Sequence, residues 1–247
     1  SMPYISEKDR SDILFGAECG FDFIAASFVR TPDDMRELRS YLKECGGESI
    51  QCIAKIENMQ GIHNFEEILK LSDGIMVARG DMGVEVEFEK LPGIQKRFIK
   101  RCQQRGKIVI TATQMLESMI QNPLPTRAEI TDVANAVFDG SSAVMLSGES
   151  AVGAYPVEAV AAMAKIAEQA ELDNPYLLPG SAMQHEMDAE DTTNAVGHAA
   201  CTLAKDIKAK ALIAITKSGY TASRMSKFRP ATPIIAATPH HKTYHQM

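Results

Sequence analysis

The sequence predicts an α/β protein built from repeated strand–helix units, and two observations lead to that prediction. Five short apolar stretches, rich in Ile, Val and Ala, recur at spacings close to the roughly 30 residues of a βαβ unit. Between them lie amphipathic stretches with a polar or proline start, three of which stop at glycine. Continuous apolar strands of this kind are typical of parallel strands that are covered on both faces.

The first part of the chain contains all five units. The expected strands are Phe21–Phe28, Ile50–Glu57, Gly74–Asp81, Lys107–Gln114 and Ser142–Glu149. The expected helices are Pro32 to about Glu44, one capped by Asn64, Leu91 to about Arg105, Pro125–Phe138 and Pro156 to about Leu172. A complete eight-unit barrel takes about 250 residues. The repeat therefore predicts a partial (β/α)8 TIM barrel over residues 1–172, or else an open doubly wound sheet.

A second, smaller α/β domain is expected after a polar linker at residues 173–190. In the region 191–247, a helix at 192–203 precedes the strands 211–216 and 233–238, which flank a short helix at 222–228. Two strands are too few for a stable independent sheet, so we expect both domains to be truncated. The histidines near the end have metal-like spacing, but we expect a flexible tail there; they are His240, His241 and His245.

The overall composition is that of a globular protein with an acidic balance. Lys plus Arg number 26 against 32 Asp plus Glu, which gives a formal net charge of −6. This balance argues against nucleic acid or an anionic membrane as the main partner. The five cysteines are odd in number and lack CxxC spacing, which favours a reducing cytoplasm. No apolar run approaches the roughly 20 residues that span a bilayer.

The strand that ends at Glu57 contains the best local indication of chemistry. Side chains two apart in a strand share a face, so Ile50, Cys52, Ala54 and Ile56 are expected to contact helices. The opposite face carries Gln51, Ile53, Lys55 and Glu57. Lys55 and Glu57 then point the same way at the carboxyl end of a strand, which is the catalytic end in a barrel. The alternative is a partly solvated Lys–Glu pair without a chemical role.

Polar groups also end the three following strands. Asp81 is expected beside Glu57 on the neighbouring strand, and paired carboxylates repel unless a cation or proton intervenes. Hard oxygen ligands favour Mg²⁺ or Mn²⁺; a tight turn that uses Asp and Gly is the alternative. Thr113 offers a hydroxyl, unless it is only a β-branched strand residue, and Ser147 and Glu149 end the fifth strand. Polar groups at four successive strand ends predict a site at this edge.

The chain resembles pyruvate kinase of the bacterial type along essentially its whole length. The matching runs are Ile5–Asp9, Ala54–Asn58, Ser72–Gly83, Thr111–Met119, Pro125–Glu129, Asp132–Asn135 and Met145–Glu149. The resemblance implies phosphoryl transfer between phosphoenolpyruvate and ADP, giving pyruvate and ATP in glycolysis. It also implies that this chain lacks the first barrel strands, the lid domain and the end of the C-terminal domain, and is inactive alone.

The resemblance implies a role for each polar residue at the predicted edge. Lys55 would contact the transferring phosphoryl group, and Glu57 with Asp81 would bind Mg²⁺ or Mn²⁺. The amides of Gly80 and Asp81 would hold the substrate carboxylate, with the Thr113 hydroxyl near the substrate methylene. A pair formed by two further residues would relay a proton behind it, namely Ser147 and Glu149.

Regulation and assembly are also implied by the resemblance. The loop Thr216, Lys217, Ser218 and Gly219 resembles an effector-phosphate loop, although an ordinary βα turn is the alternative. Potassium is expected for the full enzyme, with its ligands outside this chain, and so is a homotetramer. Two other functions stay open: a metal-dependent carbon–carbon lyase acting on pyruvate-type substrates, and a non-catalytic effector-binding or assembly fragment.

Overall fold

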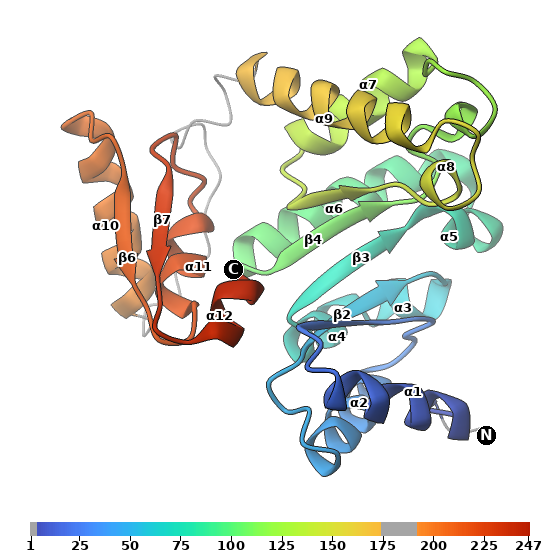
Figure 1. The fold of residues 1–247 in the computed structure, drawn as a ribbon, viewed down its shortest axis with the longest axis horizontal. Coiled ribbons are helices and arrows are strands. Elements are labelled where there is room, and N and C mark those ends of the chain that lie inside the picture. Colours follow the sequence, from blue (N-terminus) through green and yellow to red (C-terminus); the bar gives the residue numbers. More distant parts are fainter. Residues whose placement is uncertain (1–3, 174–191) are drawn as a thin grey trace.

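The computed structural model describes residues 4–173 and 192–247, which form two α/β units (Figure 1). The strands are β1 Phe23–Ala26, β2 Gln51–Ile56, β3 Gly74–Ala78, β4 Ile108–Ala112, β5 Ala143–Met145, β6 Leu212–Ile215 and β7 Ile234–Ala237. The helices of the first unit are α1 Glu7–Glu18, α2 Pro32–Glu44, α3 Met59–His63, α4 Phe65–Leu71, α5 Arg79–Glu85, α6 Leu91–Arg105, α7 Arg127–Phe138, α8 Gly148–Ala151 and α9 Pro156–Asp173. The second unit contains α10 Thr192–Asp206, α11 Tyr220–Ser226 and α12 His241–Gln246. Two 3₁₀ turns complete the elements: η1 Phe88–Lys90 and η2 Glu117–Ile120.

The five strands of the first unit form one parallel sheet in the order of the sequence, β1-β2-β3-β4-β5. Each strand pairs with the next through a connection that contains at least one helix, which is the arrangement of consecutive βα units. The predicted α/β class with a parallel five-stranded sheet is therefore confirmed. The carboxyl ends of all five strands lie along one edge of the sheet, because parallel strands run in the same direction.

The sheet has two differently packed faces, as alternation along β2 predicts. Cys52, Ala54 and Ile56 belong to the main core, which contains the buried residues of α2, α4 and α6. Ile53 belongs instead to a small cluster with Met76 and Ala112 on the other face. This inner face carries Lys55, because Lys55 follows Ile53 by two residues.

The strands are shorter than the sequence pattern suggests, and for β3, β4 and β5 most of the difference falls at the carboxyl end. The ladder between β3 and β4 ends at Ala78 and Ala112, and α5 begins directly at Arg79. The pattern also missed α1, which a capping box between Ser6 and Asp9 starts. Asn64 precedes α4 without a side-chain cap; its amide donates to the Arg30 carbonyl at 2.8 Å.

The second unit holds a two-stranded parallel sheet, β6-β7, packed on α10 and α11. The expected linker at 173–190 lies, beyond Asp173, outside the described residues. The expectation of a flexible tail is wrong: residues after His240 form α12. Lys242 on this helix pairs with Asp22 at 3.3 Å, and Gln246 donates to the Ser49 carbonyl at 2.7 Å. These contacts to the first unit order a segment that lacks a strong helical signal of its own.

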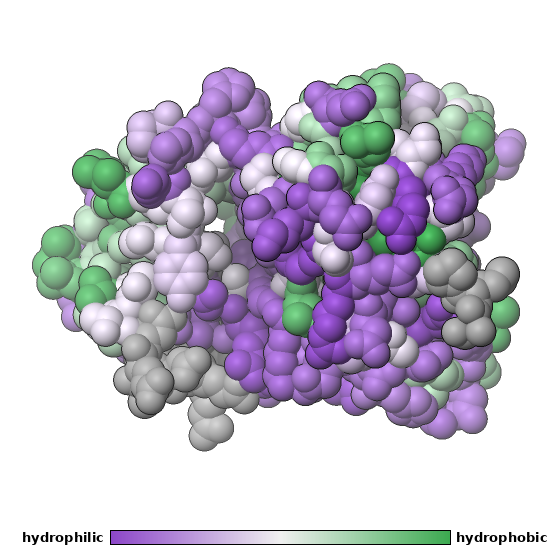
Figure 2. All heavy atoms as spheres, turned by 90° about the horizontal axis from the view of Figure 1, so that it is seen from below, coloured by the Kyte–Doolittle hydropathy of each residue, from purple (hydrophilic) through white to green (hydrophobic). Residues whose placement is uncertain are grey.

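The second unit docks where the strands of the first sheet begin (Figure 1). Side chains of the α11 region donate to backbone carbonyls in the turns there: Ser223 to Gly106, and Arg224 to Arg105. The opposite edge, where the strands end, is left to the candidate site. Figure 2 shows that hydrophilic residues predominate on the face seen from below the view of Figure 1. Among the described residues, no helix has the length and apolar character needed to cross a membrane.

Candidate functional site

Lys55 and Glu57 form a close ion pair at the carboxyl end of β2. Lys55 Nζ lies 2.7 Å from Glu57 Oε1, and the Glu57 side chain is only 1% exposed. Lys55 Nζ also bonds to the Ser27 hydroxyl at 3.1 Å, and the Phe28 amide donates to Glu57 Oε2. Ser27 and Phe28 follow β1, so the end of β1 contributes to this edge as well, which the sequence pattern did not predict. The ammonium group is thus held in place while part of it stays accessible.

Asp81 lies on the neighbouring strand–helix connection, in the first turn of α5. The register pairs Ile56 with Val77, so Glu57 is level with Ala78 and Asp81 lies beyond it, past the strand end. The expectation that both carboxylates end strands at one height is corrected accordingly. Asp81 is exposed and has no hydrogen bond or ion pair within the described parts of the chain. Its carboxylate is available to a ligand.

Thr113 occupies a left-handed turn directly after β4, with φ of 68°, and Gln114 follows with φ of 53°. The Thr113 hydroxyl donates to the Ala112 carbonyl at 2.6 Å and accepts the Gly80 amide at 2.7 Å. The hydroxyl and the amide predicted to touch the substrate therefore contact each other. A substrate carboxylate would have to take the Gly80 N–H from Thr113.

Arg79 is a further residue of this edge, and its contacts were not expected from the sequence. Its guanidinium is buried and donates twice to the Thr113 carbonyl, at 2.8 and 3.1 Å, and once to Gln114 at 3.0 Å. It also pairs with Asp132 on α7 at 2.7 Å. Arg79 therefore clamps the strained turn that carries Thr113. The available signal was an arginine directly after an apolar strand, because a guanidinium that becomes buried there needs several acceptors.

Ser147 and Glu149 both follow β5, and the Glu149 carboxylate contacts the backbone amide of Ser147 and not its hydroxyl. Glu149 is buried; it accepts the Ser147 amide at 2.7 Å on one oxygen and the Leu116 amide at 3.0 Å on the other. The Ser147 hydroxyl has no partner among the described residues. Glu149 thus ties the turn after β4 to the turn after β5, and the Ser147 hydroxyl is left to interact with water or ligand.

Backbone strain concentrates at this edge. Five described non-glycine residues have positive φ, and three of them follow β1 or β4, namely Phe28, Thr113 and Gln114. Such conformations cost about 1–3 kcal/mol each and persist where the surroundings enforce them. Here Glu57 holds Phe28 and Arg79 holds Thr113 and Gln114. Strain enforced by charged side chains is typical of a functional site.

The donor set at the edge fits a magnesium-type ion that keeps open positions. Within residues 4–173 and 192–247 no three His, Cys, Asp or Glu side chains gather as a complete cage. Glu57 and Asp81 instead offer two carboxylates from neighbouring connections. Glu57 keeps acceptor capacity beyond its bonds to Lys55 and Phe28, because a carboxylate has about four lone-pair positions. Mg²⁺ is commonly held by one or two carboxylates plus waters and substrate oxygens.

The remaining predicted site residues lie far from this edge, in the second unit. Thr216 is buried after β6, and its amide donates to the Ala237 carbonyl at 2.9 Å. The Lys217 carbonyl accepts the Thr243 hydroxyl at 3.2 Å. Ser218 and Gly219 line a cavity between the two units. The loop therefore belongs to a different part of the molecule from Lys55.

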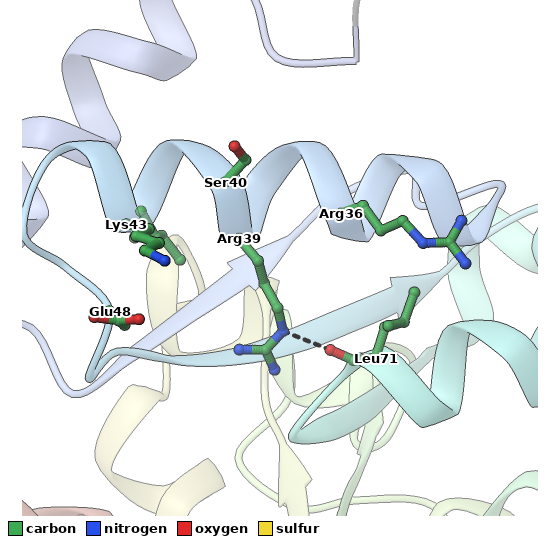
Figure 3. A pocket seen from close by; sticks show the side chains of 7 residues that line it. Arg36, Arg39, Ser40, Lys43, Glu48 and Leu71 are labelled. Carbon is green, nitrogen blue, oxygen red and sulfur yellow. Dashed lines mark hydrogen bonds between the residues drawn. The ribbon is translucent and has the colours of Figure 1, made fainter.

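A pocket of about 390 Å³ lies between α2 and the end of α4 and contains none of the predicted site residues (Figure 3). Arg39 crosses it and donates to the Leu71 carbonyl at 2.6 Å. Arg39 also pairs with Asp73 at 2.8 Å. These bonds join α2 to the end of α4, so the residues that line the pocket have a structural role in the first unit.

Comparison with known proteins assigns both units to one family. Residues 1–160 match the family "Pyruvate kinase, barrel domain", and residues 194–247 match "Pyruvate kinase, alpha/beta domain". A "Pyruvate kinase" of Clostridium perfringens is 51% identical over 243 residues, covering 98% of this chain and 51% of that protein. A "Pyruvate kinase" of Dictyostelium discoideum is 54% identical, covering 96% of this chain and 48% of that protein.

A solved structure agrees with these matches. The crystal structure of a pyruvate kinase from Cryptosporidium parvum superposes with a TM-score of 0.94 at 45% identity, covering 99% of this chain and 51% of that chain. The predicted partial barrel is thereby confirmed. The chain spans about half the length of the curated relatives it matches.

Proposed function

Because the chain belongs to the pyruvate kinase family, we propose that it forms part of a site that transfers a phosphoryl group from phosphoenolpyruvate to ADP. The products are pyruvate and ATP, and the reaction belongs to glycolysis. The observation that carries the proposal is the Lys55–Glu57 pair, 2.7 Å apart at the carboxyl edge of the sheet. Asp81, Thr113 and the strained turns surround that edge. The proposal applies to the protein at the length of its relatives.

Lys55 serves the phosphoryl transfer itself. The P–O bond to the enol oxygen breaks while a new P–O bond forms to a terminal oxygen of ADP, and negative charge is spread over the transferring group. Catalysis of such a step depends on positioning and on charge stabilisation. Lys55 Nζ is fixed by Glu57 and Ser27, so it can neutralise that charge without reorganising.

Thr113, Ser147 and Glu149 serve the second half of the reaction. The enolate left after transfer takes a proton at its methylene carbon and becomes pyruvate. The Thr113 hydroxyl is held at the edge by Ala112 and Gly80, where it can position a proton-donating water. Glu149 is buried and fixed by two amides, and the neighbouring Ser147 hydroxyl would bind water or substrate.

Glu57 and Asp81 would hold Mg²⁺ or Mn²⁺ beside Lys55. A bound divalent ion supplies Lewis acidity that stabilises the enolate and orients the substrate oxygens. The residues present fit that ion, because both are hard oxygen donors and Asp81 has no competing partner in the described chain. Potassium is expected from parts of the protein outside this chain.

Binding and assembly extend the proposal to the rest of the protein. The nucleotide would bind where the lid domain of relatives closes over this edge. The loop 216–219 would bind a phosphorylated effector, and α7 and α10 would contribute to a homotetramer. α10 exposes apolar side chains suited to an interface, including Val196 at 60% and Leu203 at 59%. The cytoplasm is the proposed location, since glycolysis takes place there.

The test replaces Lys55 with methionine in the protein at the length of its relatives. We expect pyruvate formation from phosphoenolpyruvate and ADP to fall by about 10²–10³ in kcat, because a preorganised charge is lost. Lys43→Met, an exposed lysine on α2, is the matched control and should leave kcat unchanged. Retention of activity within a few-fold in Lys55→Met contradicts the proposal. Aldol cleavage without nucleotide would favour the lyase instead.

A further inference from the structure

The cavity between the two units has the charge pattern of an anion site. It has a volume of about 580 Å³, within the roughly 300–1,000 Å³ of small-molecule sites, and lies where the strands of the first sheet begin. Four cationic side chains line it against one acidic side chain, Asp73. They are Lys107 from the first unit and Arg224, Lys227 and Arg229 from the second.

The single carboxylate does not balance these cations. Asp73 already pairs with Arg39 at 2.8 Å and accepts the Cys52 amide at 2.7 Å. Lys107 is likewise engaged, since its ammonium donates to the carbonyls of α4 and the residues after it, at 2.6 Å for Ser72. Lys107 therefore contributes positive potential, while the second unit supplies the groups that can contact a ligand.

The three cations of the second unit are partly or fully buried. Lys227 is only 5% exposed. Arg224 donates through Nη1 to the Arg105 carbonyl at 2.9 Å, but its buried Nε has no partner among the described residues. Arg229 donates to the Gly140 carbonyl at 3.0 Å. A buried guanidinium nitrogen without an acceptor is costly, so Arg224 keeps unused hydrogen-bonding capacity at the wall of the cavity.

Burial and mutual repulsion of these groups point the same way. Burial lowers the pKa of Lys107 to about 8, and the nearby charges of Arg39 and Arg224 also lower it, against the opposing charge of Asp73. Burial also lowers the pKa of Arg229. Burial disfavours the charged form of such cations, and a bound anion would stabilise that form. The Ser226 hydroxyl adds a neutral hydrogen-bond donor to the same wall, whereas the Ser223 hydroxyl donates to the Gly106 carbonyl.

We propose that the cavity between the two units binds a small molecule carrying a diphosphate group through Arg224, Lys227 and Arg229. Three nearby cations match the charge of a diphosphate better than that of one phosphate. The site lies at the edge opposite Lys55, and it adjoins the loop 216–219, because Ser218 and Gly219 line the same cavity. It is therefore a site separate from the catalytic edge and independent of the proposed reaction.

The test measures binding of inorganic pyrophosphate to the 247-residue chain by isothermal titration calorimetry, with orthophosphate as the shorter probe. Ser226 is exposed and lines the cavity, so Ser226→Glu adds a negative charge without removing an interface contact. We expect it to weaken pyrophosphate binding about tenfold, as for one unit charge facing an anion near a protein surface. Arg229→Gln should weaken binding at least as much.

Two controls separate this site from other anion sites. Ser11→Glu places the same charge on exposed α1 outside the cavity and should leave the affinity unchanged. Lys217→Gln alters the loop and should also retain binding. The proposal is overturned if the chain binds no pyrophosphate, or if Ser226→Glu binds as tightly as the unchanged chain. Equal loss in Ser11→Glu, loss in Lys217→Gln alone, or orthophosphate binding as tight as pyrophosphate would overturn it as well.

Discussion

Replacing Arg79 with methionine tests whether this side chain holds the turn after β4. Methionine keeps much of the apolar stem but removes every donor. The carbonyls of Thr113 and Gln114 then lose the partners that lie 2.8–3.1 Å away. A buried group left unsatisfied costs about 1–3 kcal/mol. Thr113 is half-buried, whereas Gln114 is exposed and its carbonyl can rehydrate, so the expected loss of stability is about 1–3 kcal/mol. Asp132 adds little, because its side chain is 37% exposed and can rehydrate.

The assay is urea unfolding followed by far-ultraviolet circular dichroism. Arg36→Met is the matched control: Arg36 also pairs with an aspartate, but its side chain is 58% exposed, so the expected loss is below about 1 kcal/mol. Arg79→Lys should fall between the two, because one ammonium cannot reproduce the guanidinium fork. If Arg79→Met were no less stable than Arg36→Met, the assigned clamp would be refuted.

Two further predictions concern the core and the pH dependence of stability. Phe98 is fully buried and stacks on Phe65 with centroids 3.8 Å apart, so Phe98→Ala should cost about 3–5 kcal/mol in the same assay; a loss below about 1 kcal/mol would contradict this packing. Burial lowers the pKa of Lys107 from 10.5 to about 8, so the unfolded chain binds more protons between these values and the contribution of Lys107 to stability rises with pH. Lys107→Met should remove that rise between pH 8 and pH 10.5, and an unchanged profile would show that Lys107 is not the group involved.

Local signals in the sequence were sufficient for several elements. Helix α6 was predicted over Leu91–Arg105 and is observed there, because a proline near its start and Gly106 after its end mark both boundaries. Gly106 has φ of 63°, which glycine adopts without steric cost. The two faces of β2 followed from alternation in the same way. Each of these features depends on residues that are close together in the chain.

Features that depend on distant residues were missed. The partners of Arg79 lie 16 to 53 positions away, so no local pattern indicates that they meet. The same holds for α12, which Lys242 anchors to residues more than 220 positions earlier. Period-two alternation also continues past the last ladder bond, which is why the strand ends were placed too late. The polar residues of the site lie in those turns, where only tertiary contacts decide the backbone.

A metal titration tests most directly whether Glu57 and Asp81 hold a divalent ion next to Lys55. Binding of Mn²⁺ to the chain can be followed by electron paramagnetic resonance of the free ion, with Glu57→Gln, Asp81→Asn and the exposed control Glu89→Gln. We predict that each of the first two weakens Mn²⁺ binding about tenfold or more, because a carboxylate ligand is lost, while Glu89→Gln does not. Equal Mn²⁺ affinity in all four proteins would contradict the account.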